Sequence, residues 1–137
     1  MKKKRTTPPR GRYPLVAFIL EVLIYFLKND VKSVTWVNGL SMTENGIQKE
    51  VSGLNIIKPG AGSYIYLDAE MQSQPLHAAR ILLHELLHLL LAIGNDEKEE
   101  YVVRRFERLL WERMTDRQKQ RLANKLPKKT AFSNNPD

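Results

Sequence analysis

The stretch "ARILLHELLHLLLAIGNDEKEEYVV", residues 79–103, decides what the rest of the chain must fold around. Its leucine-rich first part predicts a helix that is buried on most sides. This helix starts at Pro75, a favoured first-turn residue, and runs to about Ile93, where Gly94 can adopt a left-handed end cap. His84, Glu85 and His88 interrupt the leucines. Because an unpaired charge is costly in such a helix, these three residues require a compensating partner.

The spacing of HELLH is typical of a metal site. Residues four apart lie on one face of a helix, so His84 and His88 can direct two imidazoles at one zinc ion. Glu85 is rotated away from that point and can take a proton from a metal-bound water, as in H-E-x-x-H metalloproteases. The alternative is a chance match with both histidines hydrogen-bonded in the core. His77 lies ~10.5 Å before His84 along the axis, too far to share the ion.

Two histidines leave a catalytic zinc one protein ligand short. No histidine follows His88 and the chain has no cysteine, so the third ligand should be a carboxylate from the next helix, predicted over residues 96–114. The helical phase places Glu99 near the centre of that helix's apolar face, which we define by Val102, Val103, Phe106, Leu109 and Leu110. We therefore predict Glu99 as the ligand and Glu100 as the alternative. A competing role for Glu99 is to form a helix cap with Asp96.

The rest of the chain predicts an α+β domain with a small twisted sheet packed on a helical layer. "LVAFILEVLIYFLKND" predicts a buried amphipathic helix, because its apolar run is shorter than the ~20 residues that span a bilayer. "VKSVTWVNGL" predicts a strand and turn, "GIQKEVSGLNIIKPGAG" one or two short strands, and "SYIYLDAEM" a strand with one buried face. Thr115 and Gln118 predict a capping box that opens a last helix.

The sequence resembles the HExxH zincin metallopeptidases, and among them the small gluzincin-like domains of the ImmA/IrrE type found in phage and bacterial proteins. "YIYLD", HELLH and the following Glu-bearing helix carry the resemblance over residues 63–111. Metzincins would have Gly and His where this chain has Leu91 and Gly94. The resemblance implies zinc-dependent cleavage of a specific intracellular protein, with one zinc per chain and Glu85 as the catalytic base.

The resemblance also implies an edge strand along the cleft, to which a substrate backbone can pair. "SYIYLDAEM" is the candidate for this strand, so Tyr64 and Tyr66 are candidate substrate-binding residues. Either of them, or Tyr101, could donate a hydrogen bond to the oxyanion. The alternative for these tyrosines is ordinary amphipathic packing.

The charge is unevenly distributed along the chain. Residues 1–12 carry +6, residues 13–103 carry −5, residues 104–129 carry +7, and residues 130–137 carry −1. Basic ends favour a second hypothesis, in which a non-catalytic zincin scaffold binds nucleic acid or an acidic partner. We predict a basic flexible arm over 1–12, a single domain over 13–126 and a flexible tail over 127–137. We expect no membrane span and a cytoplasmic location, with secretion through the basic and apolar N-terminal segment as the alternative.

Overall fold

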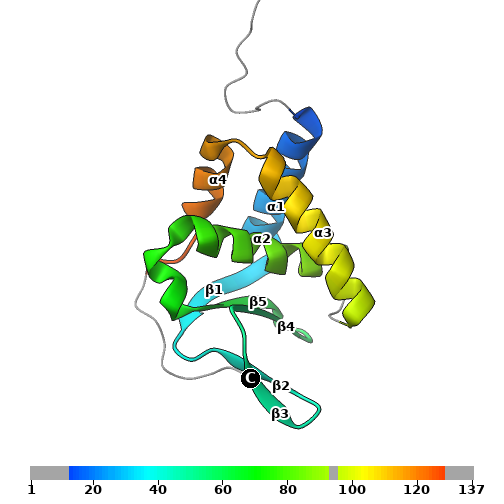
Figure 1. Ribbon diagram of the computed structural model, residues 1–137, viewed down its shortest axis with the longest axis vertical. Helices are drawn as coiled ribbons and strands as arrows, with labels where there is room; N and C mark the ends of the chain where they lie inside the picture. The colour runs from blue at the N-terminus through cyan, green and yellow to red at the C-terminus, as the bar shows by residue number, and fades with distance from the viewer. Residues whose placement is uncertain (1–12, 93–95, 129–137) are drawn as a thin grey trace, which may run out of the picture.

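The computed structural model describes residues 13–92 and 96–128, which form a small α+β fold with four α-helices and a small mixed sheet. Figure 1 shows the helices on one side of the sheet and a separate hairpin beyond it. The elements follow one another as α1 (Pro14–Asp30), β1 (Val31–Val37), β2 (Ser41–Glu44), β3 (Ile47–Glu50), β4 (Gly53–Lys58), β5 (Gly62–Asp68), the 3-10 helix η1 (Ala69–Ser73), α2 (Pro75–Leu91), α3 (Glu97–Arg113) and α4 (Asp116–Ala123).

Helix α2, which carries HELLH, is the central element of the fold. It packs against β4 and β5 on one side and against α1, α3 and α4 on the others (Figure 1). This position explains its all-round leucines, since Leu82, Leu83, Leu86 and Leu87 are at most 1% exposed. Burying such a side chain stabilises the fold by roughly 1.5–3 kcal/mol, so the helix that carries the candidate site is firmly fixed.

The three-stranded sheet has the order β1–β5–β4. β5 pairs in parallel with β1 and antiparallel with β4, so it is the central strand. Ile65 and Leu67 point to the core, as the alternation in "SYIYLDAEM" predicted. The prediction that this segment is an edge strand is wrong, because both of its sides are occupied. Tyr64 and Tyr66 therefore lie on a strand that has no free edge for a substrate backbone.

The edge of the sheet next to α2 is β4 instead. The Asp68 amide donates to the Ser52 carbonyl at 2.9 Å, and Leu54 and Ile56 pair in register with Tyr66 and Tyr64. In an antiparallel ladder the intervening residues point their backbone groups away from the partner strand. The N–H and C=O groups of Gly53, Asn55 and Ile57 therefore face the side of β4 on which no other strand of the described residues pairs. We call this side the free edge of β4.

A two-stranded hairpin of β2 and β3 projects beyond the sheet (Figure 1). Its turn contains Asn45 and Gly46 with φ values of 55° and 79°, as a tight hairpin turn requires. The Val51 amide donates to the Leu40 carbonyl at 3.1 Å and closes the base of the hairpin. It thereby forms a separate wall beside β4.

The helix ends confirm most of the capping predictions. Thr115 and Gln118 form both hydrogen bonds of a capping box at α4, and Asp96 caps α3 through the Glu99 amide at 2.9 Å. Helix α2 ends earlier than predicted, at Leu91, and Ala92 takes the left-handed conformation with φ 54°. Gly94, the predicted cap, lies outside the described residues.

Helix α1 is amphipathic, as predicted, but less buried than its sequence indicated. Val16, Leu20, Leu23 and Ile24 enter the core, whereas Leu15, Phe18 and Tyr25 are exposed. Within the described residues, no helix has both the length and the apolar character needed to cross a membrane. The side chain of Trp36 donates to the Pro127 carbonyl at 2.8 Å, so the chain is still bound to the domain where the predicted tail begins.

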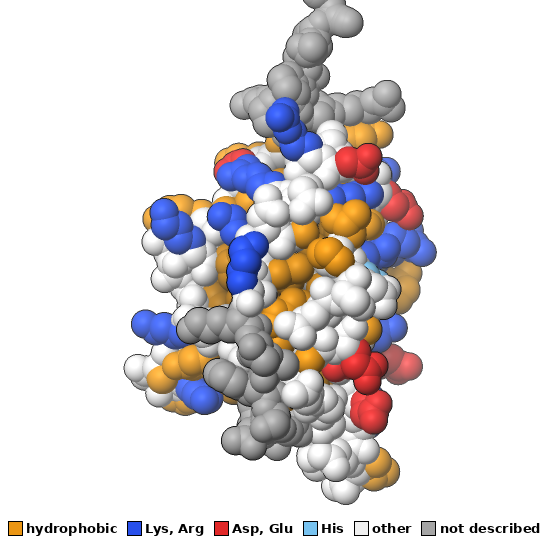
Figure 2. Space-filling view, turned by 90° about the vertical axis from the view of Figure 1, so that its left-hand side faces the viewer, with side chains coloured by type: hydrophobic (Ala, Val, Ile, Leu, Met, Phe, Trp, Pro, Cys, Tyr) orange, Lys and Arg blue, Asp and Glu red, His pale blue; other side chains and the backbone are white. Residues whose placement is uncertain are grey.

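Basic side chains of the C-terminal segment contact different parts of the fold. Arg121 pairs with Glu21 of α1, and Lys119 lies over the Trp111 ring at 5.1 Å. Figure 2 shows, on one face, Lys and Arg side chains scattered around an apolar area. The basic arm over 1–12 lies outside the described residues. On that face the basic side chains do not form a single patch.

Candidate metal centre

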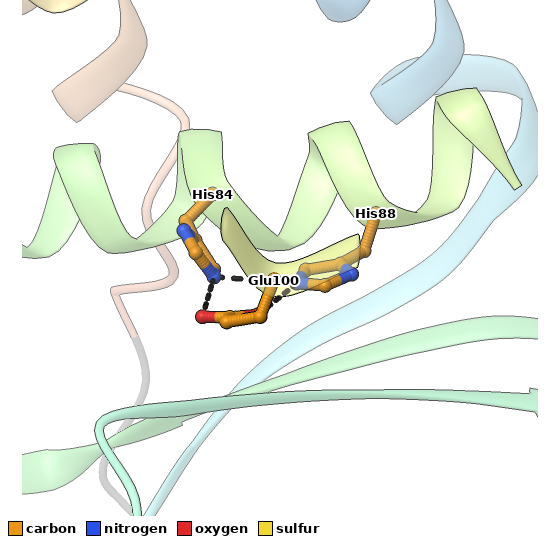
Figure 3. Close-up of side chains that lie close together, drawn as sticks. All are labelled: His84, His88 and Glu100. Carbon is orange, nitrogen blue, oxygen red and sulfur yellow. Dashed lines mark hydrogen bonds and ion pairs between the residues drawn. The ribbon is translucent and has the colours of Figure 1, made fainter. Parts of the chain in front are cut away.

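Three side chains from two helices converge at the open side of α2. His84 and His88 lie one turn apart on α2, and Glu100 reaches them from the first turns of α3 (Figure 3). The two Nε2 atoms are 3.3 Å apart. Glu100 Oε2 lies 3.1 Å from His84 Nε2, and Glu100 Oε1 lies 2.9 Å from His88 Nε2. This group of nitrogen and oxygen donors could hold a metal ion.

Glu100, the alternative in the sequence-based prediction, occupies the position that had been predicted for Glu99. The prediction placed Val102, Val103, Phe106, Leu109 and Leu110 on one inward face of α3. In the structure Val103 and Leu110 are buried, whereas Val102 and Leu109 are largely exposed. The inward stripe therefore runs Glu100, Val103, Glu107 and Leu110, at helical spacings of three and four. Glu99 lies in the first turn of α3, where its backbone amide donates to the capping side chain of Asp96.

Glu85 lies beside the histidines and is only 6% exposed. The Asn55 amide on β4 donates to Glu85 Oε1 at 2.6 Å, which fixes the carboxyl group toward the free edge of the sheet. Burial raises the pKa of Glu85, and the Asn55 hydrogen bond and the nearby histidines only partly offset that effect. A carboxylate whose pKa is raised is a stronger base than an ordinary one, which suits it to accept a proton and return it.

Gly53 allows β4 to approach α2 closely enough for this contact. A Cβ atom at Gly53 would lie 2.7 Å from Ile81 Cγ2 and 2.9 Å from Glu85 Oε2. Both distances are shorter than ordinary van der Waals contacts. The glycine therefore allows the strand edge and the carboxyl group to lie side by side.

A second carboxylate, Glu107, contacts the ring nitrogen of His84 that faces away from Glu100. Glu107 Oε1 lies 3.0 Å from His84 Nδ1, and Arg80 binds the other oxygen of Glu107. A partner of this kind orients a ligating imidazole, because an N–H donated from Nδ1 leaves Nε2 free to bind metal. The sequence-based prediction missed Glu107. Its signal was the position of Glu107 seven residues after Glu100, on the same face of α3.

The pKa shifts agree with a site prepared for a cation. Burial lowers the pKa of His84, but the hydrogen bond with Glu107 and the nearby carboxylates raise it by more, so the net pKa is raised. Burial raises the pKa of Glu100, but Arg104 and the two histidines lower it by more, so the net pKa is lowered. Glu100 is thus ionised at neutral pH and attracts positive charge.

The three donors face a cleft of about 1050 Å³. Helices α2 and α3, strand β4 and the β2–β3 hairpin supply its walls. Tyr101 lines the cleft, whereas Tyr64 and Tyr66 do not belong to its lining, and His77 is exposed elsewhere on α2. An ion held by His84, His88 and Glu100 would therefore retain a side open to molecules that enter the cleft.

Comparison of the chain with protein-family models, with curated proteins and with solved structures found no match in any of the three. The geometry of the candidate metal centre is therefore the basis for any statement about function.

Proposed function

We propose that this chain is a zinc-dependent peptide hydrolase with a zincin-like site. The observation that carries the proposal is the convergence of His84, His88 and Glu100 beside the buried Glu85. Ligands at 2.0–2.1 Å in tetrahedral geometry are about 3.3–3.4 Å apart. The donor separations of 2.9–3.3 Å are close to that value.

The donor set favours zinc among the common metal ions. Two imidazole nitrogens with one carboxylate, and an open fourth position, are the ligands of many catalytic zinc sites. Sites for magnesium and calcium use oxygen ligands almost exclusively. When bound, zinc would lower the pKa of a coordinated water and polarise the carbonyl of a scissile bond.

The residues of the chain divide the remaining work. Glu85 accepts the proton of the attacking water and returns it to the leaving amine, and Asn55 keeps the carboxyl group oriented toward the cleft. Glu107 maintains the His84 tautomer. The free edge of β4 binds the substrate backbone as an added strand, which brings an extended peptide past Glu85.

Tyr101 and Arg104 are candidates for stabilising the oxyanion, because both line the cleft next to Glu100. Tyr64 and Tyr66 are no longer candidates for this role, since they do not line the cleft. A specific protein substrate and a cytoplasmic location remain part of the proposal.

Peptide cleavage by the zinc-loaded chain tests this function. We expect wild type to cleave members of a random peptide mixture, with the products identified by mass spectrometry. Glu85→Gln should bind zinc as tightly and cleave at least about 100-fold more slowly, the usual contribution of a general base. Glu112→Gln, an exposed change on α3, is the matched control. Equal cleavage by Glu85→Gln, or a zinc-loaded wild type that cleaves nothing, would overturn the proposal.

A further inference from the structure

One wall of the cleft is strongly basic. Arg104, Arg105 and Arg108 of α3 all line it, at spacings that place them on one side of the helix together with Tyr101. We call these three residues the arginine wall. They follow Glu100 along α3, so the basic wall begins at the metal centre and extends away from it.

Most other charges in the cleft are neutralised within the chain. Lys49 pairs with Glu44 at 2.9 Å on the hairpin, and Arg80 pairs with Glu107. Arg104 donates to Glu100 at 2.8 Å, yet its side chain remains 72% exposed.

Arg105 and Arg108 differ from these paired residues. Arg105 donates a hydrogen bond to the Tyr101 hydroxyl at 3.4 Å. Across residues 13–92 and 96–128, neither Arg105 nor Arg108 forms an ion pair with a carboxylate. Arg104 and Arg108 also repel each other, because like charges four apart on a helix are unfavourable. Arg105 and Arg108 can therefore bind an anion without first breaking an internal ion pair.

We propose that the arginine wall binds acidic side chains of the peptide substrate. This inference rests on the proposed peptide hydrolysis and adds a substrate class to it. A guanidinium presents paired N–H groups that match a carboxylate. An extended peptide is favoured over nucleic acid, because the other side of the metal centre offers the free edge of β4 and a backbone can pair there.

The helix geometry sets the expected position of the acidic residues. Arg105 and Arg108 lie ~7.5 Å and ~12 Å beyond Glu100 along the axis of α3. An extended peptide advances ~3.3 Å per residue, so these distances correspond to about two and four residues from the scissile bond. Residues two apart in a strand point to the same face. The substrate should therefore carry Glu or Asp two and four residues from the cleaved bond, on one side of it.

Cleavage profiling of zinc-loaded protein tests the inference. The substrates are mixtures of twelve-residue peptides. In each mixture one position around the cleaved bond is held as Glu, Gln or Lys, and the other positions vary. Wild type should prefer Glu over Gln about tenfold at the two predicted positions, a plausible sum of two exposed charge pairs. Arg105→Gln with Arg108→Gln should reduce the preference below about threefold. Arg117→Gln with Lys125→Gln, exposed changes in the same basic segment, should leave it intact.

A binding measurement separates failure of this inference from failure of the proposed function. Fluorescence anisotropy measures the binding of two labelled peptides to the zinc-loaded Glu85→Gln variant. One peptide carries two glutamates two residues apart, and the other carries glutamines at the same positions. If nothing is cleaved but the glutamate peptide binds through Arg105 and Arg108, the wall is supported and the hydrolase proposal is not. If cleavage occurs without preference for glutamate, the proposed role of the arginine wall is wrong and the proposed hydrolase activity is supported.

Two further outcomes would also overturn the inference. The first is absence of both cleavage preference and peptide binding. The second is tighter binding of a single-stranded oligonucleotide of equal charge through the same two arginines, which would indicate a nucleic-acid ligand.

Discussion

Replacing Glu107 tests whether the outer partner of His84 prepares the metal centre. Glu107 Oε1 lies 3.0 Å from His84 Nδ1 and does not itself belong to the three-residue donor group. Removing such a partner typically weakens metal affinity by 10–100-fold, or about 1.4–2.7 kcal/mol. We expect Glu107→Ala to lose zinc affinity within this range. Competition with a chromogenic zinc chelator measures the change directly.

Two variants separate the role of Glu107 from its contribution to the fold. Glu107→Gln keeps an oxygen that can accept from His84 but loses the charge, so its affinity should lie between wild type and Glu107→Ala. Glu112→Ala removes an exposed carboxylate from the same helix and should leave affinity unchanged. An affinity for Glu107→Ala within twofold of wild type would refute the role assigned to Glu107.

Three further predictions concern Gly53, pH and the start of α4. Gly53→Ala should destabilise the fold by about 1–3 kcal/mol in urea unfolding, because its Cβ would meet Ile81 and Glu85; unchanged stability would contradict the close approach. Zinc affinity should fall as pH is lowered, starting above the ordinary histidine pKa, because the raised pKa of His84 lets protons compete earlier. Competition with a chelator from pH 8 to pH 5.5 measures the zinc affinity, and a constant affinity would contradict competition by protons at His84. Thr115→Ala should cost about 1 kcal/mol and Thr115→Ser much less; equal losses would mean that the hydroxyl cap is unimportant.

The sequence predicted the elements well where local chemistry determines them. The HELLH helix, the capping box at Thr115 and the alternation around Ile65 and Leu67 each depend on residues close together in the chain. The position of β5 in the centre of the sheet could not be predicted in this way. It depends on pairing with β1 and β4, and neither partner is encoded in the pattern of β5 itself.

The residues of the candidate site likewise differ in whether local spacing or tertiary packing places them. His84, Glu85 and His88 follow from spacing within one helix, whereas the third residue depends on how α3 is rotated against α2. That rotation is set by burial of Val103 and Leu110 while Val102 and Leu109 stay exposed, which apolar content alone does not distinguish. Asn55 binds Glu85, and a Cβ atom at Gly53 would meet it, across about thirty residues of sequence, so these two neighbours could not be predicted from the pattern around HELLH.

The zinc content of the purified chain shows whether His84, His88 and Glu100 hold a metal ion. Wild type, Glu99→Ala and Glu100→Ala are purified without added metal or chelator and analysed by elemental mass spectrometry. We expect about one zinc per chain in wild type and in Glu99→Ala, and a large loss of zinc in Glu100→Ala. Folded wild type that contains no metal and does not take up added zinc would contradict this expectation. Equal zinc in Glu100→Ala would show that the third ligand is another residue.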